Sequence, residues 1–241
     1  MTGRYSWRQG FYYVGGQGQA VNESFTMLPQ VLKQGAGYHT VAVGKWHLGY
    51  LLKQYTPTMR GFDQYLGYYN AALSDYWYHG KADSSCAGGW STDLSNNTGT
   101  RISGATGTNG TYSTRLFTSY AVDTITHHFA TDASTPLYMY LAHEAVHAAS
   151  GTVPVTGVHA GIQAPLSTVE QYDSIYPNDT YKVTAAATTE LDWSIANVTA
   201  ALKQVGVWNS TVFLFVTDNG GPLDHAINFP LRGGKHTYCK L

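Results

Sequence analysis

The amino-acid sequence predicts an α/β protein with a mostly parallel sheet sandwiched by helices. Short apolar runs typical of buried strands alternate along the chain with longer segments that keep helical spacing. Polar residues with distinctive chemistry follow three of these runs. Because parallel strands end at one edge of a sheet, where open α/β folds bind ligands, we also expect one shared site.

Composition limits the classes of function. The chain has 241 residues, of which 43% are hydrophobic, so it can bury a substantial core. Only 12% of the residues are charged, the formal net charge is -1, and no run of Lys or Arg occurs. We therefore expect a small substrate, and no nucleic acid partner. No apolar stretch approaches the roughly 20 residues of a membrane span, and residues 1–10 lack the apolar core of a signal peptide.

The first predicted element is a helix at residues 26–36. Thr26 can cap it and Pro29 suits its first turn. Gly35 and Gly37 can end it. Its buried face is expected to carry Leu28, Val31 and Leu32.

The next elements follow from the same patterns. Residues 40–43 are β-prone and should form a buried strand that runs into a loop at Gly44. Residues 80–112 are rich in Gly, Ser, Thr and Asn and should form a surface excursion outside the core. The remaining predictions are a helix at 114–129, a strand at 137–142, a long helix whose apolar stripe is Ala187, Leu191, Ile195, Val198, Leu202 and Val205, and a buried strand at 212–217.

The candidate functional residues lie just after the predicted strands. Asp218 and Asn219 offer adjacent oxygen ligands for a hard cation, although taken alone a simple Asx turn explains them better. Lys45 and His47 are alternate residues on an extended segment and could meet one anion, although taken alone a surface lysine and a structural histidine explain them better. His147 and Lys235 are each uninformative alone. Taken together, these residues could bind a sulfate or phosphate ester: lysines and a divalent cation would hold the anion, and histidines would move protons.

Five motifs then indicate a family. The segments GKWHLG, RGFDQYLGYY with DYWYH, LAHEAVHA, TDNGG and PLRGGK occur in the order and at the approximate spacing found in sulfatases. The chain resembles sulfatases of the arylsulfatase B type over nearly its whole length. This resemblance implies an alkaline-phosphatase-like α/β fold that hydrolyses sulfate esters with Ca²⁺ and a formylglycine made from cysteine.

The resemblance also assigns roles. Asp218 and Asn219 match metal ligands, and Lys45 and Lys235 match the lysines that neutralise sulfate oxygens. His47 would help the hydrated aldehyde to release sulfate, and His147 would assist the departing alcohol. The implied ligand is a sulfated small molecule or glycan.

The ends of the chain depart from the family pattern. Sulfatases carry a CxPSR or CxPAR signature just before LTGRY or MTGRY, and here MTGRY occupies residues 1–5. We therefore expect residues 1–241 to be part of a catalytic domain truncated at both ends, without the nucleophile, with an incomplete calcium site, and inactive alone. Neither Cys86 nor Cys239 lies in a matching context.

Glycosylation motifs suggest the compartment. Six asparagines head Asn-x-Ser/Thr triplets, namely Asn22, Asn96, Asn109, Asn178, Asn197 and Asn209. Together with the family, they favour a lysosomal or secreted protein. Two other hypotheses remain open at this stage: a protein that binds sulfated glycans without hydrolysing them, and a phosphatase or phosphodiesterase of the same superfamily.

Overall fold

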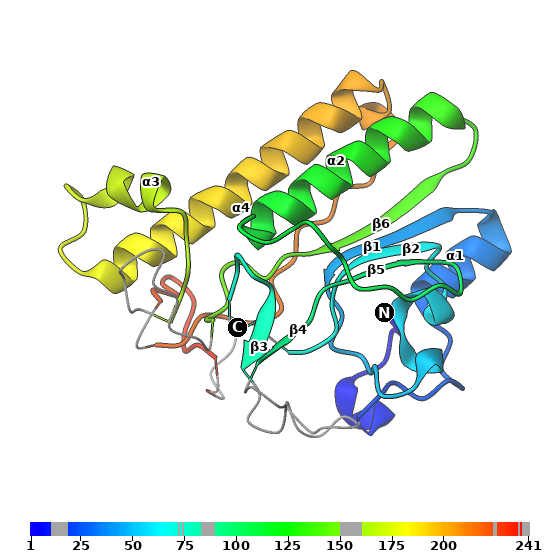
Figure 1. Ribbon diagram of the computed structural model, residues 1–241, viewed down its shortest axis with the longest axis horizontal. Helices are drawn as coiled ribbons and strands as arrows, with labels where there is room; N and C mark the ends of the chain where they lie inside the picture. The colour runs from blue at the N-terminus through cyan, green and yellow to red at the C-terminus, as the bar shows by residue number, and fades with distance from the viewer. Residues whose placement is uncertain are drawn as a thin grey trace.

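A computed structural model describes residues 1–10, 19–71, 73, 75–82, 90–149, 161–223, 226–235 and 237. Its centre is a sheet with the strand order β5-β2-β1-β6, against which two long helices pack (Figure 1). The strands of this sheet are β1 (His39–Lys45), β2 (Gln64–Tyr68), β5 (Ser95–Thr98) and β6 (Leu137–Ala142). The fold class is therefore the expected α/β class.

The sheet is mostly parallel, as predicted. β1 runs parallel to both β2 and β6, while β5 pairs antiparallel with β2. The predicted strands at 40–43 and 137–142 are confirmed. Since β1 and β6 are adjacent and parallel, the segments that follow them leave the sheet at the same edge.

Alternate residues of β1 point into two different cores. Val41 and Val43 pack in a cluster with Phe117, a residue of helix α2 (Ser113–Thr131). Ala42 points to the opposite face, where it packs in a cluster with Trp46 and Phe62. Both faces of the strand are therefore buried, which explains why its sequence is a continuous apolar run.

Helices α2 and α4 (Asp179–Gln204) lie side by side across one face of the sheet (Figure 1). Ile125 of α2 and Val198 of α4 are buried in one cluster, against which Met139 of β6 packs. Both long helices were predicted from their spacing. The opposite face is covered by shorter elements, including α1 (Leu28–Ala36), which contacts β1.

Short helices and a small hairpin complete the described elements. The 3₁₀ helices are η1 (Ser6–Gln9), η2 (Lys53–Tyr55), η3 (Pro57–Arg60), η4 (Glu170–Tyr172) and η5 (Trp208–Ser210), the short helix α3 is Leu166–Val169, and β3 (Gly80–Ala82) pairs with β4 (Trp90–Thr92).

Three sequence-based expectations were wrong in detail. The start of α1 uses the Gln30 side chain, which accepts a hydrogen bond from the Met27 backbone at 2.8 Å, rather than a Thr26 cap. Leu28 and Val31 are exposed, so the expected apolar face is not buried. Within residues 80–112, β5 joins the central sheet and Leu94 is buried, so this segment does contribute to the core.

The prediction of a buried strand at 212–217 was also wrong. These residues are outside any strand, and Val212 and Leu214 are 86% and 80% exposed. A β-prone run becomes a strand only when another strand satisfies its backbone groups. No strand lies beside this segment in the described part of the chain.

Candidate functional site

The carboxyl edge of the sheet is shaped by a close contact between β1 and β6. Gly44 has a φ of 95°, and a side-chain carbon at this position would lie 2.0 Å from the Ala142 carbonyl oxygen. Only glycine permits this approach. β1 therefore ends at Lys45 directly beside the end of β6, and the chain continues through His47, whose backbone N–H donates to the Tyr69 carbonyl oxygen at 3.0 Å.

His147 lies in a turn just beyond β6, where its protonation can be deduced from its partners. Its Nδ1 is 2.8 Å from the Ala148 carbonyl oxygen, which can only accept, so Nδ1 carries the proton. Its Nε2 is 3.1 Å from Lys235 Nζ and accepts a hydrogen bond from it. The structure therefore brings together two of the predicted residues, which are 88 positions apart in the sequence.

A folded loop places Lys235 beside the Asp218–Asn219 turn. The Asn228 side chain accepts from the Gly221 N–H at 2.9 Å and donates to the Gly221 carbonyl oxygen at 3.0 Å. The Lys235 N–H donates to that same carbonyl oxygen at 3.0 Å. The segment after Gly221 thus folds back onto the turn, which explains how distant motifs reach one site.

The charges of these residues are close enough to perturb one another. Burial lowers the pKa of the half-buried Lys45 below its usual range, and Lys235 adds to this effect. Asp218 and Glu144 act in the opposite direction. Two lysines that repel each other in a partly desolvated site are a favourable place for an anion, which relieves the repulsion.

Both histidines of the site are held in the neutral form at neutral pH. Burial lowers the pKa of His47, and the nearby Lys45 and His147 lower it further. Burial is also the main cause of the lowered pKa of His147, with contributions from Lys235 and Lys45. Neutral imidazoles next to cations can exchange protons with a substrate.

Two buried residues that the sequence did not identify as functional hold this edge in place. Glu144 is 2% exposed, and its carboxyl group accepts a hydrogen bond from the Leu73 N–H at 2.8 Å. Its burial raises its pKa to about 8. The Tyr76 hydroxyl donates to the His147 carbonyl oxygen. The DYWYH motif contained Tyr76, but only the fold shows its contact.

The oxygen donors fit a hard cation in type but are few in number. Asn219 uses its side-chain nitrogen to donate to the Gly220 carbonyl oxygen at 3.0 Å, which leaves its Oδ1 for a cation. Asp218 is exposed and supplies a carboxylate. Calcium takes six to eight oxygens. Across the described ranges, no group of three or more His, Cys, Asp or Glu residues has a metal-holding arrangement.

Cations and neutral histidines at the carboxyl edge of a mostly parallel sheet are features of α/β proteins that bind anions. Comparison with protein families identifies the family within this class, because the sulfatase family model matches residues 1–240. The chain belongs to the sulfatase family.

Two mouse relatives illustrate the match. Arylsulfatase J of Mus musculus is 38% identical over 212 residues, which cover 88% of this chain and 32% of that protein. N-acetylgalactosamine-6-sulfatase of Mus musculus is 27% identical over 246 residues, which cover 98% of this chain and 42% of that protein. The chain thus spans less than half the length of these relatives.

Solved structures agree on the fold. The crystal structure of Ps i-CgsB in complex with k-i-k-neocarrahexaose superposes with a TM-score of 0.76 at 27% identity, and covers 98% of this chain and 50% of that one. The PsFucS1 sulfatase from Pseudoalteromonas sp. superposes with a TM-score of 0.65 at 18% identity, covering 91% of this chain and 43% of that one. The fold is therefore the alkaline-phosphatase-like fold of sulfatases.

The remaining sequence-based predictions concern the surface and the cysteines. All six sequon asparagines are exposed, as glycan attachment requires. Cys86 and Cys239 lie outside the described residues. Among the helices of the described residues, none is long and apolar enough to cross a membrane.

Proposed function

We propose that this chain forms part of a sulfatase active site that hydrolyses sulfate esters of glycans. The observation that carries the proposal is the convergence of Lys45, Lys235 and His147 at one edge of the sheet, with Lys235 Nζ 3.1 Å from His147 Nε2. Sulfate is a tetrahedral anion, and fixed cations stabilise the charge that develops on its oxygens. Family membership supports the reaction class.

The proposed division of roles follows from the site. Lys45 and Lys235 bind sulfate oxygens. His147 first takes up a proton from water at Nε2 and then passes it to the departing alcohol oxygen. His47 accepts a proton when sulfate is released. Asp218 and Asn219 contribute oxygen ligands to Ca²⁺, which would draw electron density from a sulfate oxygen. The nucleophile in this proposal is a formylglycine, for which neither cysteine of the chain is a candidate.

We further propose the arylsulfatase B type for the whole protein, of which this chain is one part. The substrate would then be a sulfated amino sugar of a glycosaminoglycan, and the protein would be lysosomal or secreted. The six exposed sequons, the curated N-acetylgalactosamine-6-sulfatase relatives and the motif order support this assignment. A protein that binds sulfated glycans without hydrolysing them gains no support from the relatives.

The test is sulfate release from an aryl sulfate and from sulfated N-acetylgalactosamine by the whole protein isolated from cells that make it. Lys45→Ala and Lys235→Ala should each lower kcat/KM by about 100-fold or more, the usual effect of removing one group that stabilises transition-state charge. Lys53→Ala is the matched control, because Lys53 is an exposed lysine outside the site.

Two results would overturn the proposal. One is a wild-type protein that releases no sulfate from either compound. The other is hydrolysis that persists unchanged in both Lys45→Ala and Lys235→Ala.

A further inference from the structure

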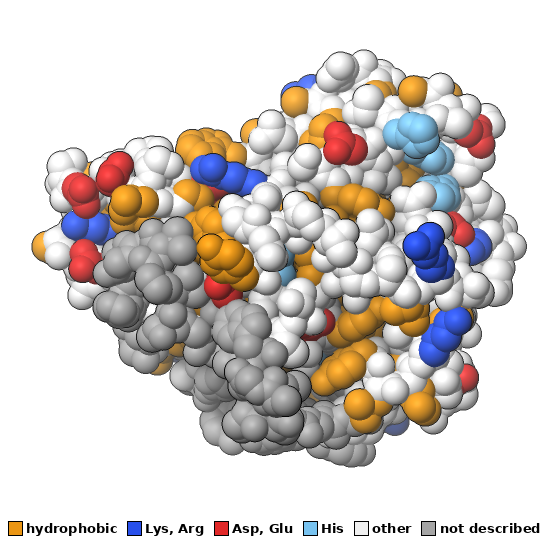
Figure 2. Space-filling view, in the orientation of Figure 1, with side chains coloured by type: hydrophobic (Ala, Val, Ile, Leu, Met, Phe, Trp, Pro, Cys, Tyr) orange, Lys and Arg blue, Asp and Glu red, His pale blue; other side chains and the backbone are white. Residues whose placement is uncertain are grey.

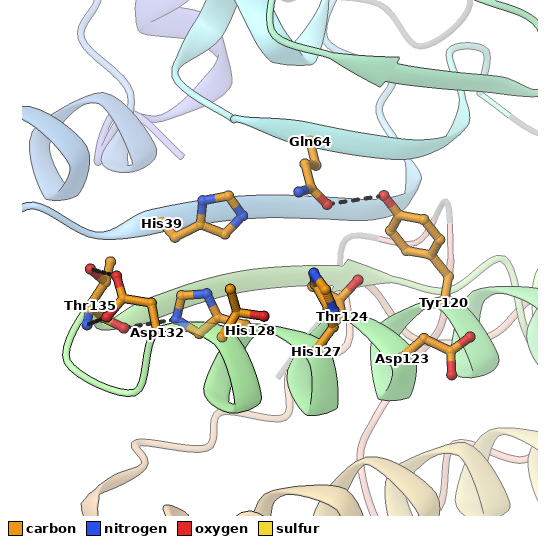
Figure 3. A pocket seen from close by; sticks show the side chains of 10 residues that line it. His39, Gln64, Tyr120, Asp123, Thr124, His127, His128, Asp132 and Thr135 are labelled. Atoms are coloured by element: carbon orange, nitrogen blue, oxygen red, sulfur yellow. Dashed lines mark hydrogen bonds between the residues drawn. The ribbon is translucent and has the colours of Figure 1, made fainter.

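A second pocket lies at the opposite, amino edge of the sheet. It has a volume of about 460 Å³ and is lined by ten residues from the starts of β1 and β2, from α2, and from the loop before β6 (Figure 3). His39 begins β1 and Lys45 ends it, so the pocket lies roughly 20 Å from the anion site at the strand rise of about 3.3 Å per residue. The two sites are therefore separate.

Flat rings form the walls of this pocket. The imidazoles of His39 and His128 stack with their centroids 5.3 Å apart and their planes 14° apart. Tyr120 and His127 add two further rings to the lining. Flat faces surrounded by polar groups suit a ligand that is itself a ring, with apolar C–H faces and hydroxyl groups at its edge.

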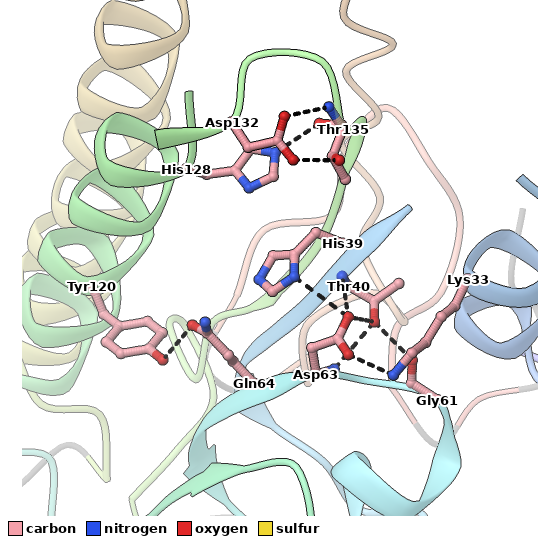
Figure 4. Close-up of polar contacts among 10 residues, drawn as sticks. All are labelled: Lys33, His39, Thr40, Gly61, Asp63, Gln64, Tyr120, His128, Asp132 and Thr135. Atoms are coloured by element: carbon pink, nitrogen blue, oxygen red, sulfur yellow. Dashed lines mark hydrogen bonds and ion pairs between the residues drawn. The ribbon is translucent and has the colours of Figure 1, made fainter. Parts of the chain in front are cut away.

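The partners of the two stacked histidines fix which of their nitrogens can receive a ligand (Figure 4). His128 Nε2 is 2.8 Å from the Thr135 carbonyl oxygen, so Nε2 carries the proton and Nδ1 can accept. His39 Nδ1 faces the Asp63 carboxylate at 3.5 Å, which favours a proton on Nδ1 and leaves Nε2 as an acceptor. Burial lowers the pKa of His39 and keeps this imidazole neutral at neutral pH.

The other polar groups complete a set that a hydroxylated ligand can satisfy. The Tyr120 hydroxyl donates to Gln64 Oε1 at 3.3 Å, so the amide nitrogen of Gln64 is the group left to donate. Asp123 is exposed and has no ion pair or hydrogen bond among the described residues. The pocket thus offers acceptors for the O–H groups of a sugar, and donors for its oxygens from the Gln64 amide, the His127 ring and the Thr124 and Thr131 hydroxyls.

The acidic side chains of this pocket disfavour a sulfated ligand. Asp123 and Asp132 line it and Asp63 lies behind His39, while Lys33 is the ion-pair partner of Asp63. These four side chains sum to a formal charge of about -2, which disfavours sulfate. Figure 2 shows the pale-blue histidines near the end of α2, with acidic side chains around them and Lys or Arg side chains close by.

We propose that this pocket binds an unsulfated pyranose sugar, at a site distinct from the one that holds the sulfate ester. The ring faces would pack against Tyr120 and the imidazoles, and the hydroxyl groups would donate to His39, His128 and Asp123. Such a site would hold a neutral part of a glycan at the amino edge of the sheet. It stands on its own residues and does not depend on the proposed hydrolysis.

The test is ligand-observed NMR and calorimetry of the chain with methyl β-galactoside and N-acetylgalactosamine at pH 7.5. Saturable binding in the millimolar range is expected for at least one of them. Asp123→Ala and His127→Ala should each weaken it by about fivefold, the effect of losing one or two hydrogen bonds or a ring contact. Thr126→Ala, at an exposed α2 position outside the lining, should leave it unchanged.

The anion site provides the second control. Lys45→Ala should leave the neutral sugars bound, whatever happens to sulfate release. Binding that disappears in Lys45→Ala but survives in both α2 variants would overturn the proposal, since the sugar would then occupy the anion site. Absence of saturable binding by both neutral sugars, or tighter binding of a sulfated sugar at the pocket, would overturn it as well.

Discussion

At the scale of single residues, Glu144 shows how the site couples to pH. Its carboxyl group is buried beside the anion site, and burial raises its pKa to about 8, while the Leu73 N–H and Lys45 oppose this rise. The folded protein therefore holds a proton on Glu144 at pH values where the unfolded chain has lost it. The contribution of Glu144 to the free energy of unfolding then falls as pH rises from about 4.5 to about 8.

Glu144→Gln should remove this dependence, because the amide is neutral at every pH and keeps an acceptor for the Leu73 N–H. We expect the free energy of unfolding of the variant to exceed that of the wild type by roughly 2–4 kcal/mol at pH 8, and to differ little from it at pH 5. Urea denaturation at both pH values measures this. Glu170→Gln changes an exposed glutamate, so its free energy of unfolding should depend on pH as that of the wild type does. If the free energies of unfolding of Glu144→Gln and of the wild type changed equally between the two pH values, Glu144 would have an ordinary pKa and the prediction would be wrong.

At the scale of elements, the contact between β1 and β6 depends on one glycine. A side-chain carbon at Gly44 would lie 2.0 Å from the Ala142 carbonyl oxygen, and both atoms belong to paired strands that cannot move apart. Gly44→Ala should lower the free energy of unfolding by about 3 kcal/mol or more, or prevent folding. Thermal and urea denaturation measure the loss.

The matched control for Gly44→Ala is a glycine in open space. Gly35 lies in α1, and no atom is within 4 Å of a side-chain carbon built there. Gly35→Ala should stabilise the protein by roughly 0.5–1 kcal/mol, because alanine favours the helix. Equal stability of the two alanine variants would contradict the role given to Gly44.

A buried carboxylate joins three helices. Glu190 of α4 is 2% exposed and accepts from Arg115 Nε at 2.8 Å and Nη2 at 2.6 Å, while the Thr168 hydroxyl of α3 donates to it at 2.6 Å. Removing only the arginine leaves the buried charge poorly compensated. Arg115→Ala should therefore lower the free energy of unfolding by about 2 kcal/mol. This loss is smaller than for a fully buried ion pair because the arginine is half exposed.

A double-mutant cycle separates this pair from its surroundings. Arg115→Ala combined with Glu190→Gln should cost less than the sum of the two single changes, since no unpaired charge remains. Arg101→Ala, at an exposed arginine, should stay within about 0.5 kcal/mol of the wild type. Simple additivity in urea denaturation would mean that the ion pair does not couple α2 to α4.

At the scale of the whole molecule, the sequence predicted what local patterns determine. The spacing of apolar residues predicted both long helices and two strands of the central sheet. The motifs contained the residues that lie near one another at the carboxyl edge of this sheet. It failed at 212–217, because a strand also needs a neighbour with free backbone groups. It could not reveal the sugar pocket, since His39 and His128 are 89 positions apart by their numbering and meet only in the fold.

The same segment governs how the molecule meets other copies of itself. Val212, Leu214 and Val216 are alternate residues of an extended stretch, and they are 86%, 80% and 80% exposed. Alternate residues share one side, so they form an apolar ridge with unpaired backbone. A ridge of this kind pairs readily with another chain, so we expect the 241-residue chain by itself to self-associate as its concentration rises.

Replacing Leu214 and Val216 together by lysine should suppress this association, because two cations on one ridge repel a second copy and reduce the apolar area. Sedimentation velocity over a range of protein concentrations measures the result. Thr188→Lys adds a charge at an exposed position of α4 without changing the ridge, so it should associate as the wild type does. If it suppresses association equally, then net charge governs the behaviour and the ridge does not.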